Sequence, residues 1–460
     1  MSIPRYISRR ALLQGGLAGA AGLVLTGCNL RPLQLLLSGD LPGFGHQPLR
    51  APGSLPYPFL PAGTDTLPQI DHIVVVMLEN HSYDNILGSM RNRGDGFTFG
   101  TDGLPTASNP GPGGEVVHAF PMPNACQQQG EPYNTWDAGH ASYDGGAMDG
   151  FVLSQSGPVS MGYEVQSTLP FTYSLAQTFP VCDRYFASVM AQTYPNRRYL
   201  MAATSLGQVT DTLSLTERPP NGTIFESLEA HGITWKNYYS SLPTVGIWTY
   251  LLNEPQTSAG LANISQFYSD AAAGSLPGFS IVDPNFGTQS EEDPQDVQYG
   301  EQFLASVVNA VMSGPGWAKT LLVWTYDECG GYYDHVPPPS AVEPDSVPPQ
   351  VTVPPDLPGA FNQYGFRVPA GVVSPFAIPD YVSHFVHDHT SILKTVERKW
   401  NLPALTLRDA NANDLLDSLD IFAPPRFLTP PALAAPANPA LGSGCLTTGP
   451  GVIPPPGSVT

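Results

Sequence analysis

The amino-acid sequence predicts an α/β fold, with a mostly parallel central sheet and helices on both faces. Two apolar runs that contain β-branched residues, HIVVVML at 72–78 and TLLVWTY at 320–326, are typical of buried strands. Segments with the apolar spacing of helices alternate with such runs along the chain. Proline (50 residues) and glycine (46) are abundant while only 13% of residues are charged, so long, ordered loops should connect the elements.

In chain order, the first strand is followed by SYDNILGSM, a short helix that Ser82 can cap. The segment SLAQTFPVCDRYF at 174–186 predicts a helix that leads into a short strand. A further helix is expected in PNRRYLMAATS, where Pro195 is a favoured first helical residue. In TIFESLEAHGITWKNYY at 223–239, we expect a helix that ends at Gly232 and then a strand.

The C-terminal half of the chain continues this alternation. A long helix is expected at 296–317, because its apolar residues recur with helical spacing. The residues of this apolar face are Val297, Phe303, Leu304, Val307, Val308 and Val311. The strand at 320–326 follows, then a strand within 367–377 and a helix at 389–403. The whole pattern is that of strands separated by covering helices.

The N-terminus has the pattern of an export signal. In SRRALLQGGLAGAAGLVLTGC, an arginine pair precedes a short apolar segment, and SRRALLQ resembles a twin-arginine signal. LTGC resembles a lipobox, in which Cys28 would be lipidated and begin the mature chain. The alternative is an ordinary twin-arginine leader with an incidental cysteine. We therefore expect export to a periplasmic or cell-surface location, with a lipid anchor preferred over secretion.

The expected organisation has four parts. Residues 1–27 form the signal peptide, and residues 28–69 form a Pro/Gly-rich tether. One folded domain is expected at 70–428. The Pro/Ala/Gly-rich tail at 429–460 is expected to form neither helix nor sheet.

The charge of the chain restricts its partners. The formal net charge is −20, and removal of Arg5, Arg9 and Arg10 with the signal peptide leaves −23 (−20 − 3). Such a surface repels nucleic acid, so no nucleic-acid partner is expected. An anionic substrate would need a local cation in order to bind.

Four cysteines remain after Cys28, and the sequence leaves their pairing open. They are Cys126, Cys182, Cys329 and Cys445. In an exported protein they can form disulfides, with three possible pairings. They lack the close spacing of a zinc site, and some could instead be buried thiols.

Two predicted strands end in acidic residues. The first strand ends at Glu79-Asn80, and the TLLVWTY strand ends at Asp327-Glu328. If both strands point the same way, their ends meet at one edge of the sheet, where ligands bind in such folds. Three neighbouring carboxylates repel one another unless a divalent cation joins them, and an all-oxygen ligand set favours Ca²⁺, Mg²⁺ or Mn²⁺. The alternative is that each pair begins a solvated loop.

A hydroxyl residue precedes the helix expected at Pro195. Thr193 lies near the positive end of that helix, where backbone N–H groups bind anions. Metal coordination at such a position can activate a hydroxyl as a nucleophile, although on sequence alone a helix cap is the more common role for such a threonine. Arg197 and Arg198 stand out in a chain poor in cations, one as a candidate phosphate clamp and the other as a structural ion pair.

Four longer segments of the chain carry a family resemblance. They are MLENHSYDNILG, QTYPNRRYLMAATS, TYDECGGYYDHVPPP and HTSILKTVERKWNLPALTLRDANANDLLDSLD. They resemble, in family order, the signature blocks of the bacterial phospholipase C / acid phosphatase family, which includes the plant non-specific phospholipases C. The resemblance implies an alkaline-phosphatase-like α/β fold. It also implies hydrolysis of phosphoesters through a covalent phospho-enzyme with a serine or threonine nucleophile.

The resemblance assigns roles to the residues at the strand ends. It implies that Glu79, Asn80, Asp327 and Glu328 bind one divalent metal ion. Thr193 would be both a metal ligand and the nucleophile. This agrees with the interpretation that the strand ends support on their own.

The resemblance also implies a set of residues around the metal site. Asp334 and His335 would lie near it on a loop, and the block TWDAGHASYDGGAMDGF would contribute polar groups. His140 follows Trp136 at helical spacing and is a candidate for the pocket wall, with a loop histidine as the equal alternative. The chain departs from the family where it has NTW for His-Ser-Trp and EEDP for Asp-x-His-Pro. Asn134 and Asp293 thus stand where two pocket histidines are expected, so the general acid is not identified. Asp293 could instead bind an extra cation.

Together these features predict an exported, metal-dependent phosphoesterase that acts through a phospho-threonine intermediate. Its substrate would be a phosphate ester or a phospholipid, with phospholipase C and acid phosphatase as the two competing types. Membrane association would occur through lipidated Cys28, and the oligomeric state stays open. The alternative is a non-catalytic, cation-binding surface lipoprotein on a degenerate phosphoesterase scaffold.

Overall fold

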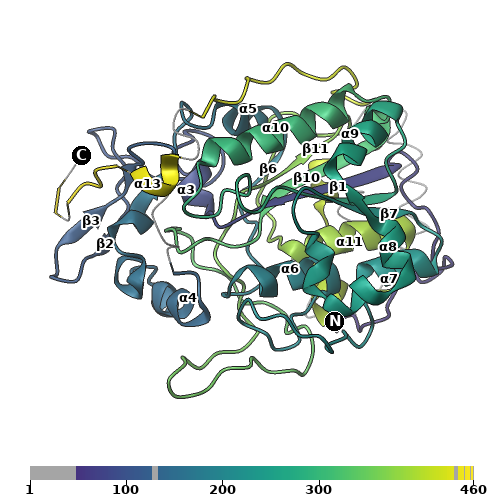
Figure 1. Cartoon of the computed structure of the whole chain (residues 1–460), viewed down its shortest axis with the longest axis horizontal. Coiled ribbons are helices and arrows are strands. Elements are labelled where there is room, and N and C mark those ends of the chain that lie inside the picture. Colours follow the sequence, from purple (N-terminus) through teal and green to yellow (C-terminus); the bar gives the residue numbers. More distant parts are fainter. Residues whose placement is uncertain (1–47, 127–132, 440–443, 450, 456, 459–460) are drawn as a thin grey trace, which may run out of the picture. The chain divides into compact units, whose positions relative to one another are not determined.

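The computed structural model describes residues 48–126, 133–439, 444–449, 451–455 and 457–458 (Figure 1). The chain divides into residues 1–49 and a compact unit at 50–460, which contains every described helix and strand. The expected signal peptide, Cys28 and the first part of the expected tether lie outside the described residues. Within the described ranges, no helix is long and apolar enough to cross a membrane.

An eight-stranded sheet forms the centre of this unit, in the order β12-β6-β11-β10-β1-β9-β7-β8. Its strands are β1 (His72–Leu78), β6 (Val181–Cys182), β7 (Trp235–Tyr239), β8 (Leu261–Asn263), β9 (Phe279–Asp283), β10 (Thr320–Tyr326), β11 (Ala370–Val373) and β12 (Val382–Ser383). Strand β11 runs antiparallel to its neighbours β10 and β6, and the other pairs are parallel. The prediction of a mostly parallel sheet is therefore confirmed.

Two small sheets lie apart from the central one. They pair β2 (Ser108–Pro110) with β3 (Val116–His118) and β4 (Phe120–Pro121) with β5 (Gly162–Tyr163). A small apolar core that includes Val117, Phe120 and Met161 supports them. They belong to the long connections that the abundance of proline and glycine predicted.

Helices cover both faces of the central sheet, as predicted. The α-helices are α3 (Tyr83–Leu87), α4 (Trp136–Tyr143), α5 (Pro170–Thr178), α6 (Thr193–Ala202), α7 (Ile224–Ala230), α8 (Pro255–Gly260), α9 (Ile264–Ala273), α10 (Val297–Ser313), α11 (His389–Trp400), α12 (Leu407–Asn411) and α13 (Cys445–Thr448). In Figure 1, α5, α9 and α10 lie on one side of the strands, while α6, α7 and α11 lie on the other. All six residues predicted for the apolar face of α10 are buried.

Strands β1 and β10 lie side by side in the middle of the sheet. Every residue of these strands is buried except the partly exposed His72, which explains why both read as uninterrupted apolar runs. Their parallel register pairs Leu78 with Tyr326. The residues that follow, Glu79 and Asp327, therefore stand next to each other at one edge of the sheet.

Local sequence signals account for several element ends. Ser82 caps α3 by accepting the N–H of Asn85 at 3.1 Å, as predicted. Helix α6 begins at Thr193, two residues before the start expected at Pro195. Gly232 follows the end of α7 with a φ of 69°, a left-handed conformation that glycine adopts without strain.

Residues 50–69, in the part of the expected tether that the structure describes, pack against the folded domain. Asn401, just after α11, donates a hydrogen bond to the carbonyl of Tyr57 at 3.1 Å. The N–H of Gly53 donates to the carbonyl of Ala404 at 2.7 Å. This segment is therefore held at the end of α11 by hydrogen bonds to its own backbone.

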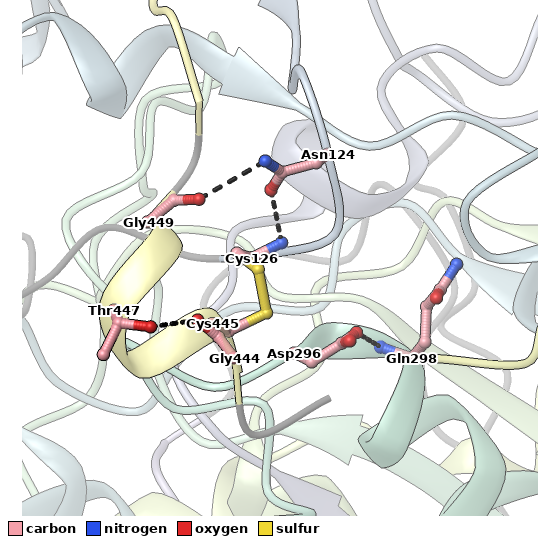
Figure 2. Close-up of a disulfide and its surroundings, with 8 residues drawn as sticks. All are labelled: Asn124, Cys126, Asp296, Gln298, Gly444, Cys445, Thr447 and Gly449. Carbon is pink, nitrogen blue, oxygen red and sulfur yellow. Dashed lines mark hydrogen bonds between the residues drawn. A yellow bond between two sulfur atoms is a disulfide. The ribbon is translucent and has the colours of Figure 1, made fainter. Parts of the chain in front are cut away.

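A disulfide joins Cys126 to Cys445 and fastens the C-terminal tail to the domain (Figure 2). This bond occurs in one of the three pairings that the sequence left open, but the other two cysteines, Cys182 and Cys329, are buried thiols. Cys445 begins α13, so the expectation of a tail without helix was wrong. The two cysteines are 319 residues apart, so the bond strongly restricts the unfolded chain.

The buried side chain of Glu164 predicts a pH-dependent stability. Burial raises its pKa to about 8, and nearby Asp296 adds to the effect. Because the folded-state pKa lies above the ordinary value near 4.5, the unfolding free energy should fall as the pH rises from 4.5 through about 8. We expect Glu164→Gln, which stays neutral, to gain several degrees in Tm relative to wild type between pH 5 and pH 9. Exposed Glu343→Gln is the control, and parallel pH profiles for all three proteins would contradict the prediction.

Candidate active site

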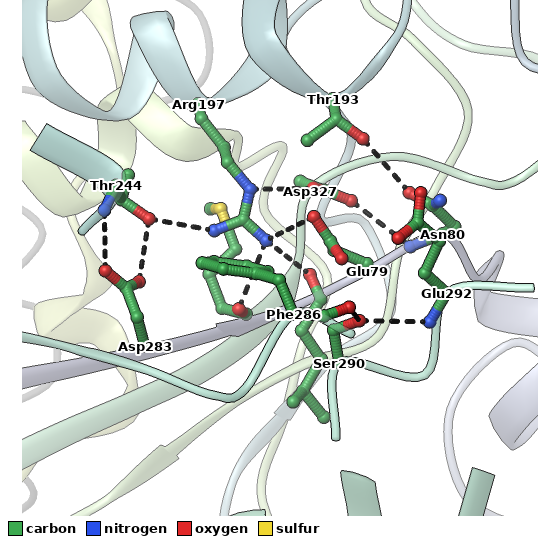
Figure 3. A network of polar contacts seen from close by, with 12 residues as sticks. Glu79, Asn80, Thr193, Arg197, Thr244, Asp283, Phe286, Ser290, Glu292 and Asp327 are labelled. Carbon is green, nitrogen blue, oxygen red and sulfur yellow. Dashed lines mark hydrogen bonds and ion pairs between the residues drawn. The ribbon is translucent and has the colours of Figure 1, made fainter. Parts of the chain in front are cut away.

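Asn80 turns the chain sharply where β1 ends. Its φ of 69° lies in the left-handed region, which asparagine adopts more readily than most residues. The turn brings the N–H of Asn80 to 3.2 Å from Asp327 Oδ1 and aims its side chain at Thr193 (Figure 3). Asparagine after Glu79 therefore has two roles, because its backbone makes the turn and its side-chain amide reaches the neighbouring polar groups.

Thr193 is the first residue of α6 and lies over the two strand ends. Its Oγ1 lies 3.3 Å from the side-chain amide of Asn80, whose oxygen accepts from the hydroxyl in one amide orientation and whose nitrogen donates to it in the other. The residue is 6% exposed. Gln192 occupies the cap position of the helix, so Thr193 is not the helix cap. The next backbone N–H, of Tyr194, is taken by Asp211 Oδ1 at 2.6 Å. The Thr193 hydroxyl thus faces the cluster of acidic groups.

Arg197 ties α6 to the ends of the strands. Its Nε lies 2.9 Å from Asp327 Oδ2, and its Nη2 lies 3.5 Å from Glu79 Oε1 and 3.3 Å from the carbonyl of Leu78. Residues four apart share one face of a helix, so these contacts also set the position of Thr193. Arg197 is almost completely buried and paired with carboxylates, which is the role of a structural ion pair rather than a free phosphate clamp.

Glu328 is held in place from two sides. Asn134 Nδ2 donates to its Oε1 at 2.7 Å, and the N–H of Gly330 donates to its Oε2 at 2.7 Å. Gly330 has a φ of 65°, and a β-carbon there would lie 2.0 Å from the carbonyl oxygen of Asn80. The close approach of the two strand-end loops thus requires glycine at this position. Asn134 lies beside the predicted metal ligands.

The polar ends of five oxygen-bearing side chains converge at this edge of the sheet. They belong to Glu79, Asn80, Thr193, Asp327 and Glu328. Three carboxylates with the one Arg197 guanidinium leave an excess of two negative charges (−3 + 1), which a divalent cation would neutralise. Glu79 Oε2 is buried and makes no hydrogen bond among the described residues. In charge, donor chemistry and the unused oxygen, these residues fit a hard divalent cation.

The protein environment opposes charge on these carboxylates. Burial raises the pKa of Glu79 well above its ordinary value, and Asp327 raises it further while Arg197 acts in the opposite direction. Burial likewise raises the pKa of Glu328, again with a contribution from Asp327. A bound cation would favour the ionised groups, because metal binding competes with protons for the same oxygens.

Comparison with known proteins identifies the family. The model of the Phosphoesterase family matches residues 70–403. The chain belongs to the phosphoesterase family. It is 32% identical over 415 residues to phospholipase C B of Mycobacterium tuberculosis (strain ATCC 25618 / H37Rv), with 78% of this chain and 79% of that protein covered. It is also 32% identical over 417 residues to the non-specific phospholipase C5 of Arabidopsis thaliana, with 82% and 78% covered.

Solved structures with a similar fold include a protein of the alkaline phosphatase superfamily from Vibrio parahaemolyticus. The TM-score is 0.40 at 12% sequence identity, with 84% of this chain and 79% of that chain covered. The phosphonate monoester hydrolase of Agrobacterium radiobacter gives a TM-score of 0.35 at 9% identity, with 76% and 77% covered. The family assignment rests on the sequence matches.

The site of this phosphoesterase opens into a pocket with a volume of about 370 Å³. Thr193, Glu79 and Arg197 form part of its wall. The remaining wall is made by Tyr194, Asp211, Leu213, Leu242, Pro243, Thr244, Gly246, Ile247, Thr249, Leu252, Phe286 and Glu292. The volume suits a small ligand or the head group of a larger one. No histidine lines the pocket within the described part of the chain.

Asp334 and His335 belong to a different buried network. His335 Nδ1 lies 2.7 Å from Asp84 Oδ2, and Arg367 contacts Asp334 Oδ1 at 2.9 Å and Asp84 Oδ1 at 3.1 Å. Asp84, Asp334 and His335 are close enough to hold a cation, but the Arg367 guanidinium already lies against both carboxylates. Neither Asp334 nor His335 lines the pocket. The structure thus places both beside Arg367.

The two remaining predicted site residues also lie away from the pocket wall. His140 Nδ1 donates to the carbonyl of Trp136 at 2.7 Å, and the centroids of the His140 and Trp136 rings lie 4.1 Å apart. Asp293 accepts the hydroxyl hydrogen bond of Tyr332 at 3.0 Å. Its neighbour Glu292 lines the pocket instead. The acid in EEDP that faces the site is therefore one residue earlier than the sequence alignment implied.

Sequence reasoning missed a third acidic strand end. Asp283 ends β9, next to β1 in the sheet, and accepts hydrogen bonds from the N–H and the hydroxyl of Thr244, each at 2.7 Å. Thr244 Oγ1 in turn accepts Arg197 Nη1 at 3.2 Å. The signal was available in FSIVD at 279–283, a short apolar run that ends in an acid like the other two.

The position of Arg197 among carboxylates predicts a strong charge dependence. Arg197→Gln should cost about 3–5 kcal/mol of unfolding free energy, because it leaves buried carboxylates without their partner. Addition of Ca²⁺, Mg²⁺ or Mn²⁺ to the chelator-treated variant should then raise Tm more than it does for wild type. Thermal unfolding with and without metal measures both effects.

Arg198→Gln is the matched control, because Arg198 pairs with Glu217 at 2.8 Å and not with the predicted metal ligands. An equal metal-dependent rise in Tm for both arginine variants would contradict the assignment of the cation site.

Proposed function

We propose that this phosphoesterase is an exported enzyme that cleaves phosphate esters through a phospho-threonine intermediate at Thr193. The observation that carries the proposal is the Thr193 hydroxyl at the start of α6, 3.3 Å from the side-chain amide of Asn80 and facing the cluster of carboxylates. A hard divalent cation, Ca²⁺, Mg²⁺ or Mn²⁺, is the proposed cofactor. Glu79, Asn80, Thr193, Asp327 and Glu328 would hold it.

The proposed reaction has two displacements at phosphorus. Thr193 Oγ1 gives up its proton to solvent and forms a bond to phosphorus as the bond to the leaving alcohol breaks, and the alcohol oxygen takes up a proton from a pocket acid, which is later reprotonated by solvent. Water then attacks the phospho-threonine, which releases phosphate or a phosphate monoester and restores the hydroxyl. When bound, a divalent cation would polarise a phosphoryl oxygen and lower the pKa of the hydroxyl. Arg197 holds Asp327 and Glu79 in place, and the N-terminus of α6 favours the negative charge.

Glu292 is the proposed proton donor to the leaving alcohol. The pocket wall has no histidine within the described residues, and its carboxyl groups besides Glu79 are Glu292 and Asp211. Asp211 accepts the N–H of Tyr194 at 2.6 Å and is exposed, whereas Glu292 is partly buried. A less exposed carboxyl group is better suited to keep a proton near neutral pH.

Phospholipids are the favoured substrates, with small phosphate monoesters as the second possibility. The relatives from Mycobacterium tuberculosis and Arabidopsis thaliana are named phospholipases C. Leucine side chains in the pocket wall support a substrate with an apolar part. Diglyceride release from phosphatidylcholine, compared with phosphate release from a phosphomonoester, separates the two types of enzyme.

Several features support export. The twin-arginine pattern and the lipobox at Cys28 are in the sequence, and the Cys126–Cys445 disulfide suits an oxidising compartment. We propose a periplasmic or cell-surface protein that is anchored through Cys28.

Thr193→Ala is predicted to abolish turnover of a chromogenic phosphate ester and of phosphatidylcholine, with a loss of at least about 10⁴-fold because no covalent intermediate can form. Thr193→Ser should retain measurable activity, since it keeps the hydroxyl. Rapid acid quenching of wild type should trap phosphate on Thr193, which mass spectrometry detects. Unchanged activity of Thr193→Ala would refute the nucleophile. Metal binding without turnover on any phosphoester would instead support the non-catalytic lipoprotein.

Glu292→Gln is predicted to discriminate between leaving groups. A p-nitrophenolate can leave without being protonated, whereas an alkoxide must be protonated to leave. The variant should therefore lose roughly 10²–10³-fold in activity on an alkyl phosphate ester and far less on a p-nitrophenyl ester. Asp211→Asn is the control and should affect both substrates alike. An equal loss on both substrates for Glu292→Gln would remove Glu292 from the role of proton donor.

A further inference from the structure

Exposed leucines surround the mouth of the pocket. Leu213, Leu215, Leu242 and Leu252, hereafter the leucine rim, are 49%, 80%, 67% and 45% exposed. Three of them, all except Leu215, also line the pocket that contains Thr193. These three side chains therefore border both the pocket with the proposed reaction site and the solvent.

The leucine rim comes from three separate segments. Leu213 and Leu215 lie in the connection between α6 and α7, and Leu242 lies between β7 and a short 3₁₀ helix at Thr244–Ile247. Leu252 belongs to a second 3₁₀ helix at Thr249–Asn253. A cluster of large, exposed apolar residues around one opening indicates a binding surface, especially when the residues come from separate segments of the chain.

Polar contacts hold the segments of the leucine rim together. The hydroxyl of Thr249 donates to the carbonyl of Ser214 at 2.6 Å, so the two loops are joined directly between Leu213 and Leu215. Arg198 of α6 pairs with Glu217 at 2.8 Å. These polar groups are thus used within the protein, while the four leucines are exposed.

The charge around the leucine rim determines which kind of membrane surface it can bind. Asp211 and Glu292 lie in the same pocket wall, and the whole chain carries a net charge of −20. An anionic membrane would repel this face. A zwitterionic phospholipid surface presents no net charge and would allow the leucines to bury against acyl chains.

From these observations, we infer that the leucine rim docks this phosphoesterase onto the surface of zwitterionic phospholipid aggregates. The inference rests on the proposed function, because the docked surface also supplies the substrate. Docking would place the pocket mouth against the lipid, so that a head group reaches Thr193 while its acyl chains remain beside the leucines. This contact would act in addition to any anchor at Cys28.

Vesicle binding tests the inference without relying on turnover. The full chain, carrying Cys28→Ser to exclude lipidation and Thr193→Ala to spare the lipid, is sedimented with phosphatidylcholine vesicles. Adding Leu215→Ser and Leu242→Ser together should weaken binding at least roughly tenfold, since each leucine loses an apolar contact. Leu428→Ser is the matched control. Leu428 is 54% exposed. It lies far from the pocket, because the carbonyl of the preceding Phe427 accepts a hydrogen bond from Trp317, which precedes β10, whereas Asp327 follows the other end of that strand.

A second measurement separates docking from catalysis. With Thr193 intact, Leu215→Ser should turn over a soluble p-nitrophenyl ester within about twofold of wild type and lose activity on vesicles, because Leu215 does not line the pocket. No turnover of any ester by wild type would overturn the proposed function, whatever the vesicle result.

Three results would overturn the docking inference. One is vesicle binding that the double leucine variant does not change. Another is binding that requires anionic phosphatidylglycerol in the vesicles. The third is a dimer of the wild-type protein in light scattering that becomes monomeric in the leucine variants, together with no binding of wild type to vesicles. That result would make the leucine rim a contact between protein copies.

Discussion

The buried guanidinium of Arg197 is the interaction on which the site depends. It joins α6 to the ends of three neighbouring strands, directly through Glu79 and Asp327 and through Thr244 to Asp283. A buried arginine is tolerated only where carboxylates compensate it, and buried carboxylates need such a partner in return. The helix is thereby fixed over the edge of the sheet. This ion pair therefore also fixes the position of Thr193, which lies one turn earlier on the same helix.

This use of Arg197 has a consequence for how an anion can bind. Its N–H groups point at carboxylates, carbonyls and Thr244, so little of its charge is directed into the pocket. The pocket wall otherwise contributes the acids Asp211 and Glu292. A phosphate group therefore meets a negative environment unless a cation is bound beside Thr193. The ion pair that builds the site therefore favours the proposal that phosphate binding needs a cation.

Much of this arrangement could be predicted from the sequence, because it follows from short-range patterns. Uninterrupted apolar runs located β1 and β10, and their acidic ends located Glu79 and Asp327. Strand β9 escaped prediction because it has only five residues and lacks a long apolar run. Glu292 lines the pocket and Asp293 does not, and this difference depends on the backbone conformation of one loop. The pairing of Cys126 with Cys445 depends on contacts across 319 residues, which no local pattern encodes.

The disulfide also changes the topology of the molecule. It closes residues 126–445 into a covalent ring that includes Thr193, Arg197 and Asp327, whereas Glu79 reaches the site from the segment before the ring. A single cut by a protease anywhere within the ring leaves both fragments attached to each other through sulfur. In a compartment rich in proteases, a nicked molecule would thus keep its cleaved pieces together, and the packed sheet could hold them in register.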